Sequence, residues 1–134
     1  MAKLTTVEGI GEVYAQKLKE AGIETTEALL EKGATPQGRQ EIAEQTGISK
    51  TLILKWVNRV DLFRVKGIGE EYADLLEAAG VDTVPELAQR NPENLYRKLV
   101  EVNEAKRLVR QLPSQAQVED WVEQAKQLPR VITY

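Results

Sequence analysis

The 134-residue sequence contains no cysteine and no histidine, and it has a single methionine and a single phenylalanine. Without cysteine the chain has neither a disulfide framework nor a thiolate metal site. Without histidine the most common metal ligand and general base is also missing. No apolar run approaches the roughly 18 residues that a membrane helix needs, and the first residues carry no apolar signal segment. These absences predict no metal site, no membrane contact and a soluble protein of the cytoplasm.

A basic excess is missing as well. The formal net charge is -3, with nine basic and nine acidic side chains in residues 1–64, and nine and twelve in residues 65–134. Neither half is therefore drawn to nucleic acid or to an anionic membrane by bulk charge. The hydrophobic content of 42% is high enough for a folded core and too high for disorder.

What the sequence does have is an internal repeat. The stretch VEGIGEVYAQKLKEAGIETTEALL begins at Val7, and its near-copy VKGIGEEYADLLEAAGVDTVPELA begins at Val65. Twelve positions are identical at an offset of 58, which indicates a tandem duplication. The repeat predicts two halves, residues 1–60 and 61–134, that share one continuous core. Further on, Trp56 aligns with Trp121 at an offset of 65, so the second half carries about seven extra residues around KRLVRQLP.

The periodicity predicts helices throughout and no strand. Tyr14, Leu18 and Ala21 are spaced i, i+4, i+7, as on one face of a helix. Gly22 and Gly80 follow such runs where a glycine commonly ends a helix. Helices as short as these are marginal alone and must pack against one another. Predicted N-caps are Thr35 and Asn91, each followed by proline, and predicted capping boxes are Thr83–Glu86 and Ser114–Gln117.

The repeat is centred on two glycine turns, Gly9-Ile10-Gly11 and Gly67-Ile68-Gly69. We expect the first glycine to let the chain reverse and the isoleucine to fill the gap between the flanking helices. The second glycine leaves the first amides of the next helix without partners, at the positive end of its dipole, where phosphate can bind. The alternative is a purely structural turn, in which Glu12, Glu70 and Glu71 are favourable first-turn acids.

This pattern resembles the helix-hairpin-helix motif: hydrophobic-Gly-hydrophobic-Gly with alanine four residues later, here Ala15 and Ala73. Gly47-Ile48-Ser49 is a looser version, in which serine takes the place of the second glycine. The whole chain resembles a family of bacterial helix-hairpin-helix proteins described as a domain of unknown function. The resemblance implies an all-α fold of two tandem helix-hairpin-helix repeats packed with pseudo-twofold symmetry.

The resemblance also implies a partner. Helix-hairpin-helix units usually bind DNA without sequence preference, through hairpin amides on backbone phosphates, and some hold a monovalent cation with hairpin carbonyls. Paired units engage both strands across the minor groove. Other members have lost DNA binding and serve as protein-docking or scaffold modules, so an unidentified protein is the alternative partner. The residues predicted to bind phosphate are Gly9, Ile10, Gly11, Gly67, Ile68, Gly69, Lys17, Lys19, Lys66 and Lys50.

The remaining features of the sequence do not indicate catalysis or a cofactor site. No Ser-His arrangement, P-loop or metal-ligand spacing is present, so we expect no catalytic residue, no metal, no other cofactor and no small-molecule substrate. Trp56 and Trp121 are predicted core anchors. The C-terminal PRVITY stretch packs back on the domain or is a docking peptide. The densest positive cluster is either a solvated helix face or a phosphate-tracking patch, and consists of Arg97, Lys98, Lys106, Arg107 and Arg110.

Overall fold

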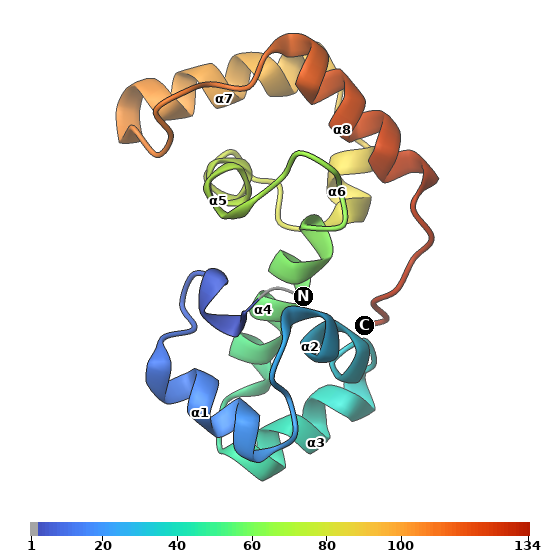
Figure 1. Ribbon diagram of the computed structural model, residues 1–134. Helices are drawn as coiled ribbons and strands as arrows, with labels where there is room; N and C mark the ends of the chain where they lie inside the picture. The colour runs from blue at the N-terminus through green and yellow to red at the C-terminus, as the bar shows by residue number, and fades with distance from the viewer. Residues whose placement is uncertain (1–2) are drawn as a thin grey trace. The chain divides into compact units, whose positions relative to one another are not determined.

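Helices make up all of the regular structure in residues 3–134, the part of the chain that the computed structural model describes (Figure 1). Within these residues the β contact is limited to an isolated bridge between Lys3 and Thr25, so the predicted all-α class is confirmed. None of these helices is long and apolar enough to cross a membrane. The order is η1 (Leu4–Thr6), α1 (Glu12–Glu20), α2 (Thr26–Lys32), α3 (Pro36–Thr46), α4 (Lys50–Leu62), α5 (Glu70–Ala78), α6 (Val84–Ala88), α7 (Pro92–Lys106) and α8 (Gln115–Gln127).

The chain divides into two compact units. The first contains the residues up to Asp61 together with Arg130–Tyr134, and the second is Leu62–Pro129. The first unit is therefore completed by a segment that follows the whole of the second unit in the sequence. A pseudo-twofold relation and a single core shared by the two halves stay predictions.

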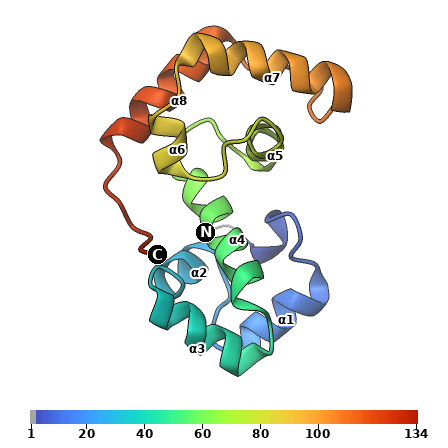
Figure 2. The ribbon, with the colours of Figure 1, turned by 180° about the vertical axis from the view of Figure 1, so that it is seen from behind.

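In the first unit α3 lies beside α1 and α2, as the two opposite views agree (Figures 1 and 2). Its core is formed largely by one face of α4, where Ile53, Trp56 and Val60 are almost fully buried. These residues recur at intervals of three and four, the spacing that keeps apolar side chains on one side of a helix. Leu18 of α1 and Leu29 of α2 are buried with them. The predicted role of Trp56 as a core anchor is confirmed.

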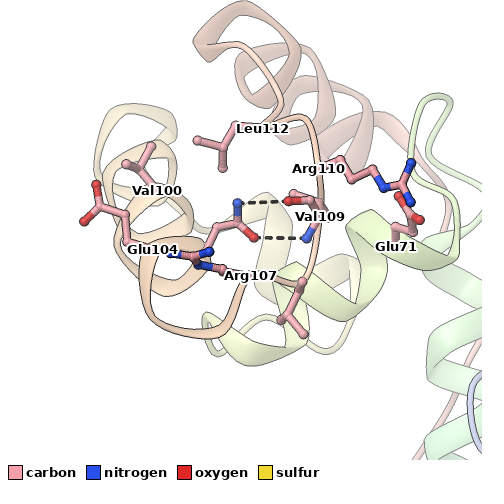
Figure 3. A pocket seen from close by; sticks show the side chains of 9 residues that line it. Glu71, Val100, Glu104, Arg107, Val109, Arg110 and Leu112 are labelled. Carbon is pink, nitrogen blue, oxygen red and sulfur yellow. Dashed lines mark hydrogen bonds between the residues drawn. The ribbon is translucent and has the colours of Figure 1, made fainter.

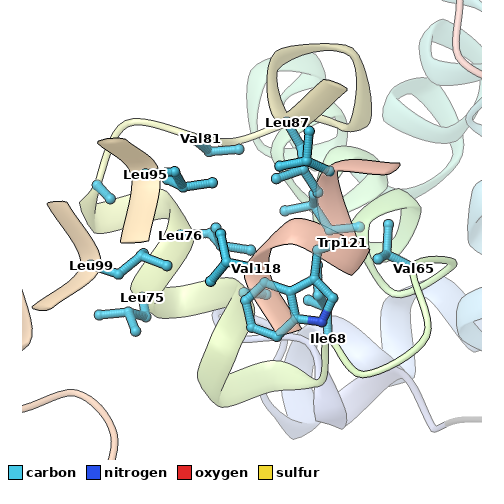
Figure 4. Packing of buried hydrophobic residues seen from close by; sticks show 14 of the residues in the cluster. Val65, Ile68, Leu75, Leu76, Val81, Leu87, Leu95, Leu99, Val118 and Trp121 are labelled. Carbon is cyan, nitrogen blue, oxygen red and sulfur yellow. The ribbon is translucent and has the colours of Figure 1, made fainter. Parts of the chain in front are cut away.

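In the second unit, buried side chains of α5 to α8 interdigitate (Figure 4). α8 packs against α6 and α7 and contributes Val118, Trp121, Val122 and Ala125, again at intervals of three and four. Trp121 is 1% exposed and confirms the second predicted anchor.

The helix ends follow the sequence signals with one exception. The side chains of Thr35 and Asn91 accept N-cap hydrogen bonds as predicted, and Ser114 and Gln117 form both bonds of a capping box. At Thr83, however, the predicted box is only half formed. The Thr83 hydroxyl accepts from Glu86 N–H (3.2 Å), but Glu86 Oε1 accepts from the preceding amide, that of Asp82 (3.1 Å). The box prediction is wrong for that second bond, because the carboxylate reaches one residue further back.

Candidate phosphate-binding hairpins

The first glycine turn joins η1 to α1. Val7 N–H donates to Leu4 O (3.0 Å), and Ile10 N–H donates to Val7 O (3.0 Å). Between them Gly9 has φ +94°, a backbone conformation that side chains rarely allow. Ile10 is 3% exposed and so fills the interior beneath the turn, while Gly9 and Gly11 remain exposed.

The second glycine turn, between α4 and α5, has the same local arrangement. Val65 N–H donates to Leu62 O and Ile68 N–H donates to Val65 O, both at 3.1 Å. Gly67 has φ +99°, and Ile68 is 4% exposed. Both turns therefore place a buried isoleucine between two exposed glycines.

At the first glycine of each turn, a tryptophan indole lies so close that a side chain would not fit without displacement. A Cβ on Gly9 would lie 3.2 Å from Trp56 Nε1, and a Cβ on Gly67 would lie 2.9 Å from Trp121 Nε1. The tryptophans pack in turn against tyrosines just after the turns. The ring centroids of Tyr14 and Trp56 are 5.2 Å apart. The close approach that the glycines permit is thus made by a tryptophan of the same unit.

The second glycine of each turn meets open space. A Cβ added to Gly11 or to Gly69 would have no atom within 4 Å. Both glycines are N-caps in extended conformation, and neither α1 nor α5 has a side-chain cap. The first helix-type amide bonds belong to Ala15 and Ala73, whose N–H groups donate to Gly11 O and Gly69 O at 2.9 Å. Within residues 3–134 the amides of residues 12–14 and 70–72 have no hydrogen-bond partner.

Not every amide of the turns is open. In the second turn, Lys66 N–H donates to Gln124 Oε1 (2.8 Å) and Lys66 O accepts from Gln124 Nε2 (3.1 Å). In the first turn, the residue before the glycine is Glu8, whose carboxylate lies 4.0 Å from the guanidinium of the buried Arg59. The residue ahead of each first glycine is thus in contact with the last helix of its unit, through its backbone at Lys66 and through its side chain at Glu8. Within the turns, the amides of Ile10, Lys66 and Ile68 are already bonded and are not open to a ligand.

The resemblance implies a monovalent cation bound by backbone carbonyls of the glycine turns. Val7 O, Val65 O and Lys66 O each already accept one hydrogen bond. Since a carbonyl oxygen has two lone pairs, these bonds leave room for a further contact. Within residues 3–134 no group of three or more carboxylate, histidine or cysteine side chains is arranged to hold a metal ion. A cation at a hairpin stays a prediction.

The predicted lysines lie at different places. Lys19 shares a shallow hollow of about 390 Å³ with Lys3 and Glu12, the first residue of α1. The Lys17 ammonium lies 6.0 Å from the centre of the Tyr14 ring on the same helix. Both are exposed near the first turn, and the side chain of Lys66 is exposed within the second.

Lys50 follows the third turn, Gly47-Ile48-Ser49, where side chains already occupy the groups that a phosphate would contact. Its Nζ donates to Gln40 Oε1 of α3 (3.1 Å). Ser49 Oγ accepts from Leu52 N–H (3.2 Å), so the serine caps α4 and occupies one of its free amides. Gly47 has φ +75°, and Ile48 is buried as in the other turns. Serine in place of the second glycine therefore keeps the turn but covers an amide that a phosphate would need.

Sequence reasoning did not predict that two arginines of the second half line the same hollow as a residue in the first turn of α5. At the offset of 58, Lys17 and Lys19 correspond to Leu75 and Glu77, so α5 itself supplies no cation there. The extra residues of the second half form the connection from α7 to α8, and Arg107 and Arg110 of this connection line a hollow of about 650 Å³ (Figure 3).

That hollow also includes Glu71, the second residue of α5. Two contacts fix the connection in place. Val109 is held by both atoms of the Asn103 amide, at 3.0 and 3.1 Å, marked by the dashed lines in Figure 3. Tyr72 Oη donates to Gln111 O (3.0 Å). Two sequence features could have pointed to these arginines: α5 lacks the lysines of α1, and the extra residues of the second half are rich in basic side chains.

The comparisons with known proteins identify a family. A family model described as "Domain of unknown function (DUF4332)" matches residues 8–128, which is most of the chain and includes both glycine turns. The chain matched no curated protein and no solved structure.

Proposed function

The chain belongs to the DUF4332 family, a domain of unknown function, and we propose that it is a non-enzymatic module that binds the nucleic-acid backbone weakly and without sequence preference. The description of its turns as helix-hairpin-helix elements is part of this proposal. The contacts are made by the uncapped amides that follow Gly11 and Gly69. A cytoplasmic location, where nucleic acid is accessible in bacteria, also belongs to the proposal.

One observation carries the proposal: both helix starts present unpaired amides beside open space. Nothing lies within 4 Å of a Cβ built on Gly11 or Gly69, and neither helix has a side-chain cap. Phosphate oxygens are suited to such sites because the amides point outward and the helix dipole favours negative charge. The third turn, where Ser49 occupies an amide of α4, offers no equivalent site.

Carboxylates next to the amides oppose this binding without abolishing it. Glu12, Glu70 and Glu71 are exposed in the first turns of α1 and α5. Each raises the energy of a phosphate about 6 Å away by roughly 0.5–1 kcal/mol at the dielectric of water. A charge-assisted amide bond contributes about 1.5–3 kcal/mol. Two such bonds at a helix start exceed the penalty, so the carboxylates weaken phosphate binding but do not abolish it.

Cations near each turn add to the attraction, though from different sources. The first turn has Lys17 and Lys19 on the following helix, and the second has Lys66 together with Arg107 and Arg110 of the longer connection. These few charges neutralise only a few phosphates. Since the salt dependence of binding grows with the number of phosphates neutralised, we expect a shallow dependence.

The test is a titration of fluorescently labelled DNA duplex with the full chain at low salt. We expect saturable binding whose log–log slope against salt is about −2 to −4, since each neutralised phosphate contributes about −0.9. Several unrelated duplex sequences should bind equally, and a neutral labelled probe of the same dye should not bind. Absence of any binding at low salt would contradict the proposal.

Replacing both arginines of the α7–α8 connection should weaken duplex binding, because two positive charges beside the second turn are lost. For R107Q/R110Q we expect a slope against salt that is shallower by about one to two, because up to two phosphate contacts are lost. The matched control is R97Q/K98Q on α7, which removes the same charge from residues that do not line the hollow. Equal losses in both variants would mean that only net charge matters at this site.

A second function, docking of a partner protein, is favoured by one observation. Val13, directly after the first turn, is 70% exposed, and Leu108, in the hollow beside the second turn, is 38% exposed. Apolar side chains at these places would suit a protein surface better than a phosphate backbone. A duplex titration without binding, combined with a protein partner whose binding is lost in L108D, would favour this alternative.

A further inference from the structure

The segment Arg130–Tyr134, here called the tail, lies on the first unit like a bound peptide. It has no regular structure, and both views show it ending beside α2 (Figures 1 and 2). Thr133 N–H donates to Ala34 O at 2.8 Å. Tyr134 Oη donates to Asn58 Oδ1 at 2.9 Å. The receiving surface, here called the tail groove, consists of Gly33, Ala34, Arg39 and Asn58.

The centre of the tail groove is a buried cation that depends on the tail. Arg39 is 5% exposed, and its two terminal nitrogens donate to Gly33 O (2.8 Å) and to Thr133 O (2.7 Å). Burial lowers the pKa of Arg39, and Tyr134 raises it. A buried guanidinium that loses a hydrogen-bond partner is costly, so the groove is poorly satisfied when the tail is absent.

The tail is held by one buried side chain and by polar and ring contacts near the surface. Ile132 is 3% exposed and provides its apolar anchor, whereas Thr133 and Tyr134 are exposed, Tyr134 to 56%. A segment with one buried side chain and a handful of hydrogen bonds opens far more readily than a helix of the core. The tail can therefore leave while the groove, built from the α2–α3 connection, α3 and α4, persists.

The position of the tail in the chain favours exchange. The tail comes after the whole second unit, Leu62–Pro129, yet belongs to the first. Its recognition uses backbone groups, one isoleucine and one tyrosine, and a second copy of the chain carries the identical segment. Elements that are held in this way exchange between identical chains at low energetic penalty, because the contacts made are the same.

We propose that the tail groove is an exchange site and that a second copy of this chain is its partner, supplying residues 130–134 in place of the groove's own tail. This inference stands apart from the nucleic-acid proposal, because it uses neither glycine turn. Ile132 fills the apolar position, and Thr133 presents its carbonyl to Arg39. The tethered tail competes at an effective concentration in the millimolar range, so exchange grows with protein concentration.

The first arm of the test uses a labelled peptide with the sequence of residues 128–134, LPRVITY. The full chain carrying I132D, whose own tail fits poorly, should bind this peptide at least tenfold more tightly than the wild-type chain does. A peptide with I132D should bind at least tenfold more weakly, and R39Q in the I132D chain should abolish binding. Circular dichroism checks that each chain is folded.

The second arm uses two full chains with complementary defects. The I132D chain has an intact groove, and the R39Q chain has an intact tail. Each alone should sediment as a monomer, and an equimolar mixture should form a one-to-one complex. T133P, which removes the amide that bonds to Ala34 O while keeping Ile132, serves as a second acceptor.

Three results would overturn the proposal. One is a folded I132D or T133P chain that fails to bind the peptide. Another is peptide binding without any complex between the two complementary chains, which would exclude a second copy as partner. The last is loss of folding in both acceptor variants, which would make the tail a fixed part of the first unit. The duplex titration reports none of these, so failure of one proposal is distinguishable from failure of the other.

Discussion

Replacing Gly67 by alanine is expected to destabilise the chain by about 2–4 kcal/mol, combining strain at positive φ with steric overlap. The new Cβ would lie 2.9 Å from Trp121 Nε1 while the backbone holds φ +99°. Neither partner can move away easily, since Trp121 is 1% exposed and is packed against Tyr72 with ring centroids 5.3 Å apart. Urea unfolding followed by circular dichroism measures the loss.

Gly69→Ala is the matched control for this change. Gly69 stands two residues away, has extended backbone and has no atom within 4 Å of an added Cβ. We expect a loss of no more than about 1 kcal/mol, because alanine is only a poorer N-cap than glycine. Gly9→Ala should lie between the two, since its Cβ would be 3.2 Å from Trp56 Nε1. Equal losses at positions 67 and 69 would contradict the role assigned to the tryptophan.

The sequence predicted those features that depend on neighbouring residues. A glycine after a helical run predicts a left-handed helix end, and Gly22 and Gly80 have φ +84° and +93°. Isoleucine between two glycines predicts an inward side chain, and Ile10 and Ile68 are buried. Such signals act within a few residues of the chain, so a single sequence is enough to read them.

Features that depend on distant residues could not be predicted in the same way. The tryptophan behind each turn comes from a helix far along the chain, and only the fold brings Trp56 to Gly9. Arg39 gave no sign that it would be buried, because its partners include a carbonyl of the tail. For the tail, the sequence left a packed segment and a docking peptide as alternatives. The structure shows a segment that is packed through one buried isoleucine and through polar contacts near the surface.

The glycine turns combine two requirements in three residues. The first glycine allows the close approach of a tryptophan and is therefore explained by the fold alone. A Cβ added to the second glycine would meet no atom within 4 Å, so packing does not explain why this residue is glycine. A residue with a capping side chain, such as the Ser49 of the third turn, would stabilise the helix start better than glycine that leaves amides unpaired. The position where structure gives no reason for glycine is the one that the nucleic-acid proposal uses.

Proline at the first residue of α1 and of α5 is expected to weaken duplex binding by at least about tenfold relative to glutamine at the same positions. The reason is that each proline removes an amide whose bond to phosphate contributes about 1.5–3 kcal/mol. The variants are E12P/E70P and E12Q/E70Q. Both remove the same two carboxylates, and only the proline pair removes the N–H groups. Proline is favourable at the first helical position, and the extended conformation of Gly11 and Gly69 suits a residue that precedes proline.

The glutamine pair also makes a prediction of its own. Removing each carboxylate takes away roughly 0.5–1 kcal/mol of repulsion, so E12Q/E70Q should bind duplex about two- to fivefold more tightly per site than the wild-type chain. Thermal unfolding should be nearly the same in all three proteins, since no hydrogen bond among residues 3–134 depends on these amides. If the proline and glutamine pairs bind duplex equally well, the amides do not contact phosphate. Any binding that remains would then come from the exposed lysines and arginines, and the second glycine of each turn would need another explanation.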